Sequence, residues 1–223
     1  MMEVRFEKDL MEANNRQATE VNRVLSEKGI LTLNLLSSPG AGKTTLLEET
    51  LGRLKGKMKA AVIVGDVQTS RDQERFERRG FTAVQINTEG GCHLTAGMVE
   101  KALGSLDLRN LEILFIENVG NLVCPAGFHL GEDMKVVLLS TTEGDDKPGK
   151  YPSAFFNAQV LIITKIDLLP FTNFDLKAAV GDAMRINPNL MLFEVSSLKG
   201  VGMEVWLDWL MRAARRKREK LGQ

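Results

Sequence analysis

A phosphate-binding loop follows the first apolar segment of the chain, and it restricts the possible folds more than any other feature. The loop reads SSPGAGKTT over residues 37–45 and leads into a helical pattern that begins LLEETL. Gly40 and Gly42 allow the backbone amides to turn inward, where they and the start of the following helix can bind an anion. The residues expected to contact a nucleotide here are Pro39, Gly40, Ala41, Gly42, Lys43, Thr44 and Thr45.

Two side chains of this loop have defined expected roles. Lys43 reaches the β- and γ-phosphates, and the Thr44 hydroxyl is a ligand for Mg²⁺. The loop departs from the pattern G-x-x-x-x-G-K-[ST] at its first position, where Ser37 replaces glycine. This change alters the start of the turn and leaves the anion-binding part intact.

Seven short aliphatic runs follow one another along the chain, and helical patterns separate most of them. The runs cover residues 30–36, 60–66, 82–87, 111–118, 135–142, 159–167 and 190–196. The helical patterns cover residues 7–28, 43–55, 70–79, 94–103, 174–186 and 205–220. This alternation predicts an α/β fold of the P-loop NTPase type, a G domain with a doubly wound, mainly parallel sheet of about seven strands buried on both faces. Ligands should bind at the carboxyl ends of the strands.

The simplest division of the chain is an N-terminal helical arm at residues 1–29 and a P-loop GTPase domain at residues 30–223. The hydrophobic content of 43% is enough for a full core, which excludes a disordered chain. The N-terminus is too charged for a signal peptide and the apolar runs are too short to span a bilayer, so we expect a cytoplasmic protein with no membrane partner.

The charges give no long-range attraction to nucleic acid, because 29 Lys and Arg balance 29 Asp and Glu. A basic run at residues 212–220 leaves two interpretations open. It could contact nucleic acid, or it could close a C-terminal helix whose late cations complement the helix dipole. We favour the helix, and predict no nucleic-acid partner.

A second motif predicts which base is bound. Thr164-Lys165-Ile166-Asp167 is a variant of N-K-x-D with threonine in place of asparagine. Asp167 can accept hydrogen bonds from guanine N1 and N2, which adenine does not offer, and the Lys165 stem can lie over the base. Ser197 follows the last strand, where a base-contacting loop would lie. An unpaired polar group costs about 1–3 kcal/mol, so GTP should be preferred over ATP.

Acidic residues lie where ligands of a catalytic metal ion belong. Glu117 ends a very apolar run, and with Gly120 it forms E-x-x-G, so that the Gly120 amide could face the γ-phosphate. Asp66 ends the second run and Asp72 follows it. Either aspartate could bind Mg²⁺ or orient the attacking water, although Asp72 would equally suit a helix N-terminus. Lys43, Asp72 and Glu117 are the catalytic candidates, and the sequence identifies no general base.

Softer ligands occupy two other loops. Cys92 and His93 lie after the third run, where we expect them to open a helix, and Cys124 lies beyond Glu117. A cysteine at a helix N-terminus tends toward a metal-binding thiolate, and this ligand set suits Zn²⁺ or Ni²⁺. Buried structural cysteines and a capping histidine are the alternative. Three ligands leave a site incomplete, and a two-fold dimer would bring two copies together and complete it.

The ordered motifs SSPGAGKTT, GDVQTSRD, EGGCHL, ENVGNLVCP, GDDKPGKYP and TKID resemble those of the nickel-incorporation GTPases of hydrogenase maturation. These are P-loop proteins of the SIMIBI class and close relatives of the urease-accessory GTPase. The resemblance covers the chain from residue 30. It implies slow GTP hydrolysis, a nucleotide-dependent homodimer, and delivery of nickel to a hydrogenase large-subunit precursor with other accessory proteins.

The resemblance also implies residue roles. Lys43 and Thr44 hold phosphate and Mg²⁺, Asp72 and Glu117 lie in the metal and switch region, and Asp167 reads guanine. Lys150 reaches the nucleotide or a partner across the dimer. The implied Ni²⁺ or Zn²⁺ site consists of Cys92, His93 and Cys124.

One departure from the family concerns nickel storage. Many members carry an N-terminal cysteine motif or histidine-rich stretch, and residues 1–29 contain neither residue type. We therefore expect nickel to come from a separate carrier. Two other functions stay open at this point: a metal-binding accessory module in which nucleotide only stabilises the fold, and a small-molecule phosphotransferase.

Overall fold

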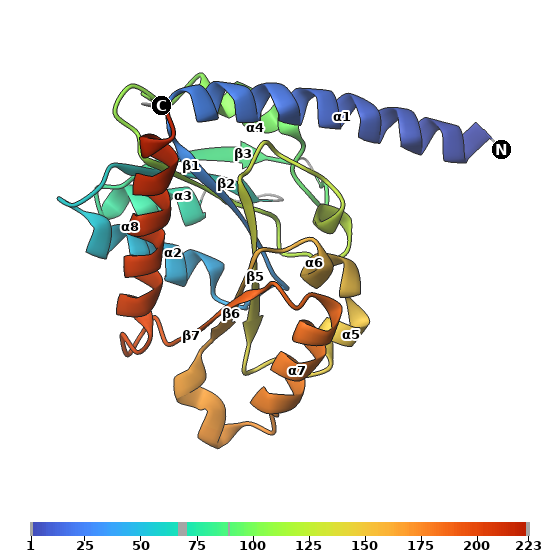
Figure 1. The fold of residues 1–223 in the computed structure, drawn as a ribbon, viewed down its shortest axis with the longest axis vertical. Helices are drawn as coiled ribbons and strands as arrows, with labels where there is room; N and C mark the ends of the chain where they lie inside the picture. The colour runs from blue at the N-terminus through green and yellow to red at the C-terminus, as the bar shows by residue number, and fades with distance from the viewer. Residues whose placement is uncertain (1, 67–70, 89, 222–223) are drawn as a thin grey trace.

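The computed structural model describes residues 2–66, 71–88 and 90–221, with side chains from residue 10 onward except those of residues 66, 71 and 72. Within this part, one parallel sheet has the order β3-β2-β4-β1-β5-β6-β7 (Figure 1). Its strands are β1 (Leu31–Leu36), β2 (Ala60–Asp66), β3 (Thr82–Asn87), β4 (Ile113–Glu117), β5 (Met134–Ser140), β6 (Val160–Thr164) and β7 (Met191–Val195). The predicted α/β fold is confirmed.

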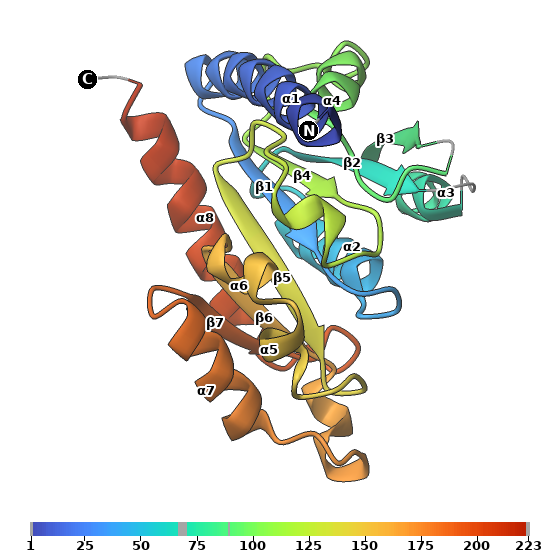
Figure 2. The ribbon, with the colours of Figure 1, turned by 90° about the vertical axis from the view of Figure 1, so that its right-hand side faces the viewer.

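Helices cover both faces of the sheet (Figure 2). They are α1 (Met2–Glu27), α2 (Lys43–Leu54), α3 (Arg71–Arg78), α4 (Ala96–Leu103), α5 (Lys147–Lys150), α6 (Pro152–Phe156), α7 (Leu176–Ile186) and α8 (Met203–Glu219), with 3-10 turns η1 (Cys124–Ala126) and η2 (Ile166–Phe171). Alternate strand residues face opposite ways. Leu33 and Phe115 pack with α2, α3 and α8, whereas Leu114 and Ile116 pack with α1 and α4. A third cluster joins β5 and β6 to α6 and α7.

The sequence pattern located every strand, and the differences lie at the edges and in short elements. The expectation that all strands are buried on both faces is wrong for β3 and β7, whose side chains are partly exposed. These are the edge strands, each paired with a neighbouring strand on one side only, so their outer side is open. The short elements α5, α6, η1 and η2 were not predicted, because a single turn shows no helical period.

The two ends of α1 have different surroundings. Ala18, Val21 and Leu25 are buried, and the last two pack in the cluster that contains α4. The start of the helix extends beyond the sheet (Figure 1). The C-terminal part of α1 therefore belongs to the core, and the division of the chain at residue 29 stays a prediction.

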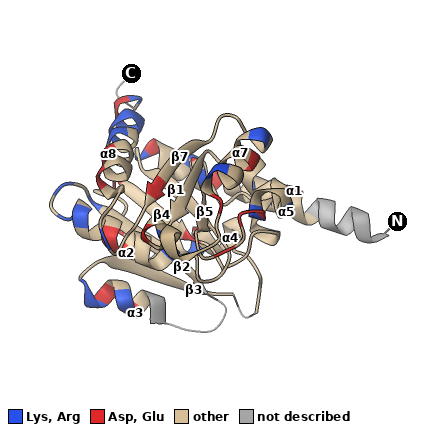
Figure 3. Cartoon of the chain, turned by 90° about the horizontal axis from the view of Figure 1, so that it is seen from below, with Lys and Arg blue, Asp and Glu red and all other residues tan. Residues whose placement is uncertain are grey.

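The predicted C-terminal helix is α8, and Lys and Arg residues gather toward its C-terminal end (Figure 3). Lys217 pairs with Asp133 at 2.6 Å, and Arg218 pairs with Glu112 at 2.9 Å. Part of the basic run thus attaches α8 to the loops that precede β5 and β4. Among the described helices, none has both the length and the apolar character needed to cross a bilayer.

Trp206 of α8 makes a testable contribution to stability. Its ring is buried against Trp209 at a centroid distance of 5.2 Å, and its Nε1 donates to Thr50 Oγ1 at 3.0 Å. We expect Trp206→Ala to lower the free energy of unfolding by about 3–5 kcal/mol, because it leaves a cavity and an unpaired hydroxyl. Urea denaturation followed by circular dichroism measures this. Val205→Ala, at an exposed position of α8, is the control and should change the value by less than about 0.5 kcal/mol.

Candidate nucleotide and metal sites

The phosphate-binding loop connects β1 to α2 and lines a pocket of about 530 Å³ at the carboxyl ends of the strands. Gly40 and Gly42 have φ angles of +77° and +96°, which favour glycine, and Gly42 directly precedes α2. The lining residues are Pro39, Gly40, Ala41, Gly42, Lys43, Thr44, Thr45, Gly65, Arg75, Glu117, Asn118, Val119, Gly120 and Lys165. All the residues expected to contact phosphate from this loop are among them.

Lys43 and Ser37 explain how the loop functions without its first glycine. The Lys43 side chain is buried, and its Nζ donates to Ser37 Oγ at 2.9 Å. Ser37 has no positive φ, so glycine is not required there. The ammonium is therefore held inside the loop, at the base of the phosphate pocket.

Thr44 and Glu117 bring together the oxygen donors that Mg²⁺ prefers. Thr44 Oγ1 donates to Glu117 Oε1 at 2.7 Å, and Glu117, at the end of β4, is only 4% exposed. A hydroxyl and a carboxylate at this distance fit a Mg²⁺ ion that also contacts nucleotide phosphate. Asp66 ends β2 and Asp72 lies in α3, but their side chains lie outside the described residues.

Gly120 brings the β4 loop, which connects β4 to β5, against the phosphate-binding loop. A methyl group at Gly120 would lie 3.1 Å from Pro39 Cα, closer than a normal contact. Asn118 and Val119 line the same pocket, as does Arg75 of α3, which pairs with Glu48 at 2.7 Å. Arg75 and Asn118 were not predicted to line this pocket, since Arg75 lies outside the quoted motifs and Asn118 is an unspecified position of E-x-x-G.

The Thr164-Lys165-Ile166-Asp167 motif begins at the end of β6. Lys165 has φ +57°, and its Nζ donates to Gly40 O at 2.8 Å. Thr164 Oγ1 donates to Ala41 O at 2.7 Å, so the threonine that replaces asparagine attaches this motif to the phosphate-binding loop.

Three other predicted nucleotide contacts lie outside the pocket. Asp167 lies in η2 and Ser197 follows β7, at the same edge of the sheet. Neither lines the pocket in the described part of the chain. Lys150, at the end of α5, is exposed and pairs with Asp146 at 2.6 Å.

The three soft ligands converge although they come from two loops. The candidate ligand atoms of Cys92, His93 and Cys124 all lie within 4.8 Å of one another. Cys92 and His93 belong to the β3 loop, which connects β3 to α4, and Cys124 begins η1 in the β4 loop. The His93 ring packs on Phe128 with a centroid distance of 4.1 Å. The set can bind a transition metal through two sulfurs and one nitrogen.

The expectation that Cys92 and His93 open a helix is wrong. Helix α4 begins at Ala96, and Thr95 caps it by accepting a hydrogen bond from Met98 N. Contact with the Cys124 thiol, together with partial burial, raises the pKa of Cys92 rather than lowering it. Burial lowers the pKa of His93, which favours its neutral, metal-binding form. Metal binding would therefore displace a proton from the Cys92 thiol.

Asn121 connects the two sites. Its backbone forms an isolated antiparallel bridge with Ser37, and its Nδ2 donates to Cys92 O at 3.3 Å. Its Oδ1 accepts a hydrogen bond from Val123 N at 2.8 Å, next to Cys124. The same residue thus contacts the phosphate-binding loop and both metal-ligand segments.

Comparisons with known proteins agree with this geometry. Residues 31–194 match the model of the CobW/HypB/UreG nucleotide-binding domain. The hydrogenase maturation factor HypB of Escherichia coli K12 is 50% identical over 210 residues, which are 94% of this chain and 72% of that protein. The probable hydrogenase maturation factor HypB of Methanocaldococcus jannaschii is 42% identical over 86% of this chain and 88% of its own.

A solved structure gives the corresponding result for the fold. The crystal structure of HypB from Helicobacter pylori in complex with nickel superposes with a TM-score of 0.87 and 39% identity, over 92% of this chain and 96% of the other. The sequence match and this structural match lead to the same assignment. The chain belongs to the CobW/HypB/UreG family of P-loop nucleotide-binding proteins.

Proposed function

We propose that this protein is a GTP-hydrolysing metallochaperone that couples its nucleotide state to nickel delivery during maturation of [NiFe]-hydrogenase. The observation that carries the proposal is the position of Cys124, in the loop whose Gly120 lines the phosphate pocket. The HypB relatives, one of them crystallised with nickel, support nickel as the metal. The delivery partners would be other accessory proteins and a hydrogenase large-subunit precursor.

In the nucleotide site, the roles of Lys43, Thr44 and Glu117 follow from their contacts. Lys43 exchanges its Ser37 partner for the β- and γ-phosphate oxygens, which are stronger acceptors. Thr44 and Glu117 hold Mg²⁺, and Asp66 and Asp72 are the further candidates from the predicted set. When bound, Mg²⁺ neutralises the charge of the phosphates as the γ-phosphate leaves.

Hydrolysis in this site would be slow and regulatory. Lys43 stabilises the developing charge, and the Gly120 amide donates toward the γ-phosphate. Glu117 or Asp72 orients the attacking water. The described pocket offers no histidine as a base, so positioning and electrostatics carry the catalysis.

Guanine selection would depend on Asp167, with the Lys165 stem over the base. Ser197 would contact the base from the loop after β7. Lys150 would leave Asp146, an exposed pair of little energetic value, to reach the nucleotide or the second protomer.

The metal site would be completed by a second copy of the chain. A tetrahedral zinc or planar nickel shell takes four ligands, and Cys92, His93 and Cys124 supply three. Because Cys92 is exposed, two copies can approach at this point. A two-fold homodimer pairs each loop with its own copy, and would add ligands to the three that the described part of one chain brings together.

Asp167→Asn tests guanine recognition. The aspartate accepts two hydrogen bonds from guanine, whereas the asparagine amide can donate to the 2-oxo group of xanthine. We expect the GDP dissociation constant to rise by about tenfold or more and that of xanthosine diphosphate to fall. Isothermal titration calorimetry measures both. Asp208→Asn on the exposed side of α8 is the control, and unchanged GDP affinity in Asp167→Asn would remove the assigned role.

Nickel titration in each nucleotide state tests the coupling. We expect the nickel affinity with GDP and with a non-hydrolysable GTP analogue to differ by about 5–150-fold, the usual range for linked sites. Light scattering on the same samples gives the oligomeric state. Equal nickel affinities in the two states would refute the delivery mechanism and leave the metal-binding accessory module.

Gly120→Ala should reduce this difference, because the new methyl group would meet Pro39. Gly127→Ala is the matched control in the same loop, since its methyl group would lie 3.7 Å from the flexible end of Met11. The same titrations measure both variants. If Gly120→Ala shows the same difference in nickel affinity between the two nucleotide states as wild type, the contact with Pro39 does not transmit the nucleotide state.

A further inference from the structure

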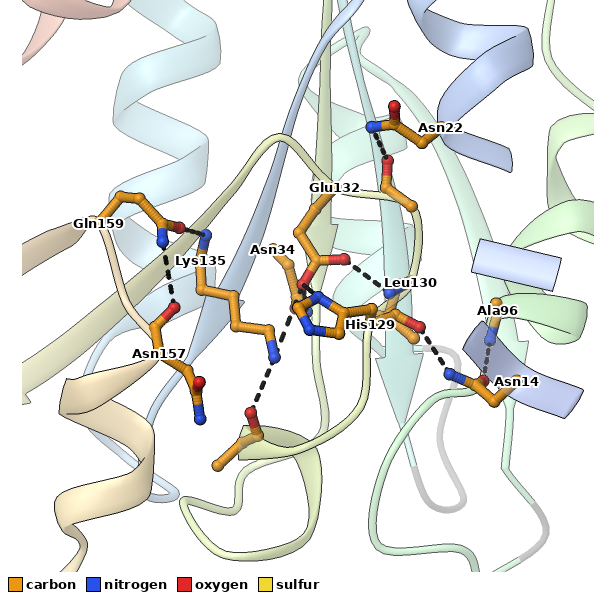
Figure 4. Close-up of polar contacts among 12 residues, drawn as sticks. Asn14, Asn22, Asn34, Ala96, His129, Leu130, Glu132, Lys135, Asn157 and Gln159 are labelled. Carbon is orange, nitrogen blue, oxygen red and sulfur yellow. Dashed lines mark hydrogen bonds and ion pairs between the residues drawn. The ribbon is translucent and has the colours of Figure 1, made fainter. Parts of the chain in front are cut away.

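Two buried polar side chains lie behind the metal-ligand segments without belonging to the ligand set: the first hydrogen-bonds to both segments, and the second to the β4 loop. One is Asn14 of α1 and the other is Lys135 of β5 (Figure 4). Buried polar groups are costly unless they form hydrogen bonds, so their partners indicate what they do.

Asn14 bridges the two loops directly. Its Nδ2 donates to His129 O at 2.8 Å, and its Oδ1 accepts a hydrogen bond from Ala96 N at 2.9 Å. Ala96 follows the segment of His93, and His129 follows the segment of Cys124. The side chain is only 6% exposed, so both bonds are shielded from water. One amide therefore sets the spacing between the two ligand segments.

Lys135 holds the turn that carries Cys124. Its side chain is 2% exposed, and its Nζ donates to Ala126 O at 2.8 Å. Burial lowers the pKa of this lysine, because removal from water disfavours the charged ammonium. Ala126 ends η1, which begins at Cys124, and Phe128 of the same segment packs on His93. The bond to Ala126 therefore orients a thiol ligand and the wall beside the imidazole ligand.

An ion pair and three hydrogen bonds connect Lys135 to the other loop. Glu132 lies 3.9 Å from Lys135 Nζ and accepts a bond from Asn34 Nδ2 at 3.3 Å. Asn34 Oδ1 accepts from Asn118 Nδ2 at 3.2 Å, and Asn118 Oδ1 accepts from Leu94 N at 3.2 Å. Asn118 also lines the nucleotide pocket. The network thus ends on the backbone beside the imidazole ligand.

We propose that Asn14 and Lys135 are positioning residues of the metal site, which hold the Cys124 segment at a fixed distance from the Cys92–His93 segment. They do not touch the metal. The proposal rests on the proposed function in so far as the ligands bind nickel. Residues that orient metal ligands from behind typically change metal affinity by about 10–100-fold when removed.

The first test compares two asparagines of one helix. Asn22 of α1 donates to Gly131 O at 3.0 Å, in the same β4 loop but away from the ligand segments. Asn14→Ala and Asn22→Ala should both lower the melting temperature. Only Asn14→Ala should weaken nickel binding, by about tenfold or more. Equal nickel affinity in Asn14→Ala and wild type would overturn the role of Asn14.

The second test separates positioning from charge burial at Lys135. Lys135→Met removes the bond to Ala126 and leaves the Glu132 carboxylate buried without its cation, so it should destabilise the fold. Lys135→Met/Glu132→Gln removes that charge as well and should recover much of the melting temperature. The nickel affinity should stay about tenfold weaker in both variants. If the double variant recovers nickel affinity as well as the melting temperature, Lys135 has only a structural role.

A third measurement needs no metal. Diamide oxidises the two thiols to a Cys92–Cys124 disulfide while the reagent is reduced to its hydrazine, and the rate reports how often the sulfurs meet. Asn14→Ala and Lys135→Met/Glu132→Gln should form this disulfide severalfold more slowly than wild type and Asn22→Ala. Unchanged rates would overturn the positioning role.

Nickel titration of Cys92→Ala, made in parallel, distinguishes failure of the positioning role from failure of the proposed function. If wild type and Cys92→Ala bind nickel equally, the assigned metal site is wrong, whatever the thiol rates show. If nickel binding depends on Cys92 but Asn14→Ala and the double variant behave as wild type, the site survives and the positioning role is wrong.

Discussion

The strands of the described sheet all run in the same direction, and the chemistry of the protein depends on this constraint. Parallel strands direct every carboxyl end to one edge, so the loops after β1, β3, β4 and β6 meet there. The phosphate-binding loop occupies the centre of that edge because β1 is the central strand. The β4 loop emerges beside it, and Gly120 allows the two backbones to lie in contact. Cys124, the candidate metal ligand in the β4 loop, therefore lies at the same edge of the sheet as the phosphate pocket.

The two faces of the sheet differ in the kind of side chain that they bury. The face under α2 and α8 is a continuous apolar cluster that includes Trp206 and Trp209. The opposite face holds two apolar clusters, and buried polar residues such as Asn34 and Lys135 lie in β1 and β5. Apolar packing tolerates exchange of similar side chains, whereas a buried hydrogen-bond network permits one arrangement. The face behind the candidate metal ligands thus contains a buried hydrogen-bond network in addition to its apolar packing.

Coupling between two sites is reciprocal, so a nucleotide that changes nickel affinity must itself be bound more or less tightly when nickel is present. The described contacts provide a short route for coupling between the nucleotide site and the candidate metal site. Asn121 bridges to Ser37 and donates to the carbonyl of Cys92. Ser37 Oγ also accepts the hydrogen bond from Lys43. A movement of Lys43 toward phosphate would therefore break its bond to Ser37, the residue to which Asn121 is bridged.

Local sequence determined the positions of the strands, the phosphate-binding loop and the candidate metal ligands. The apolar runs specified the strands, the order of glycines in SSPGAGKTT specified the phosphate-binding loop, and the presence of two cysteines and two histidines limited the candidate soft ligands to a few residues. These features depend on residue periodicity or backbone freedom, which neighbouring residues decide. The tertiary structure decided what depends on distant partners: the exposure of the edge strands, the raised pKa of Cys92 beside Cys124, and the roles of Arg75 and Asn118 at the pocket. It also decided that Asn14 joins Ala96 to His129, because a hydrogen bond between residues so far apart in the chain forms only when packing has brought them together.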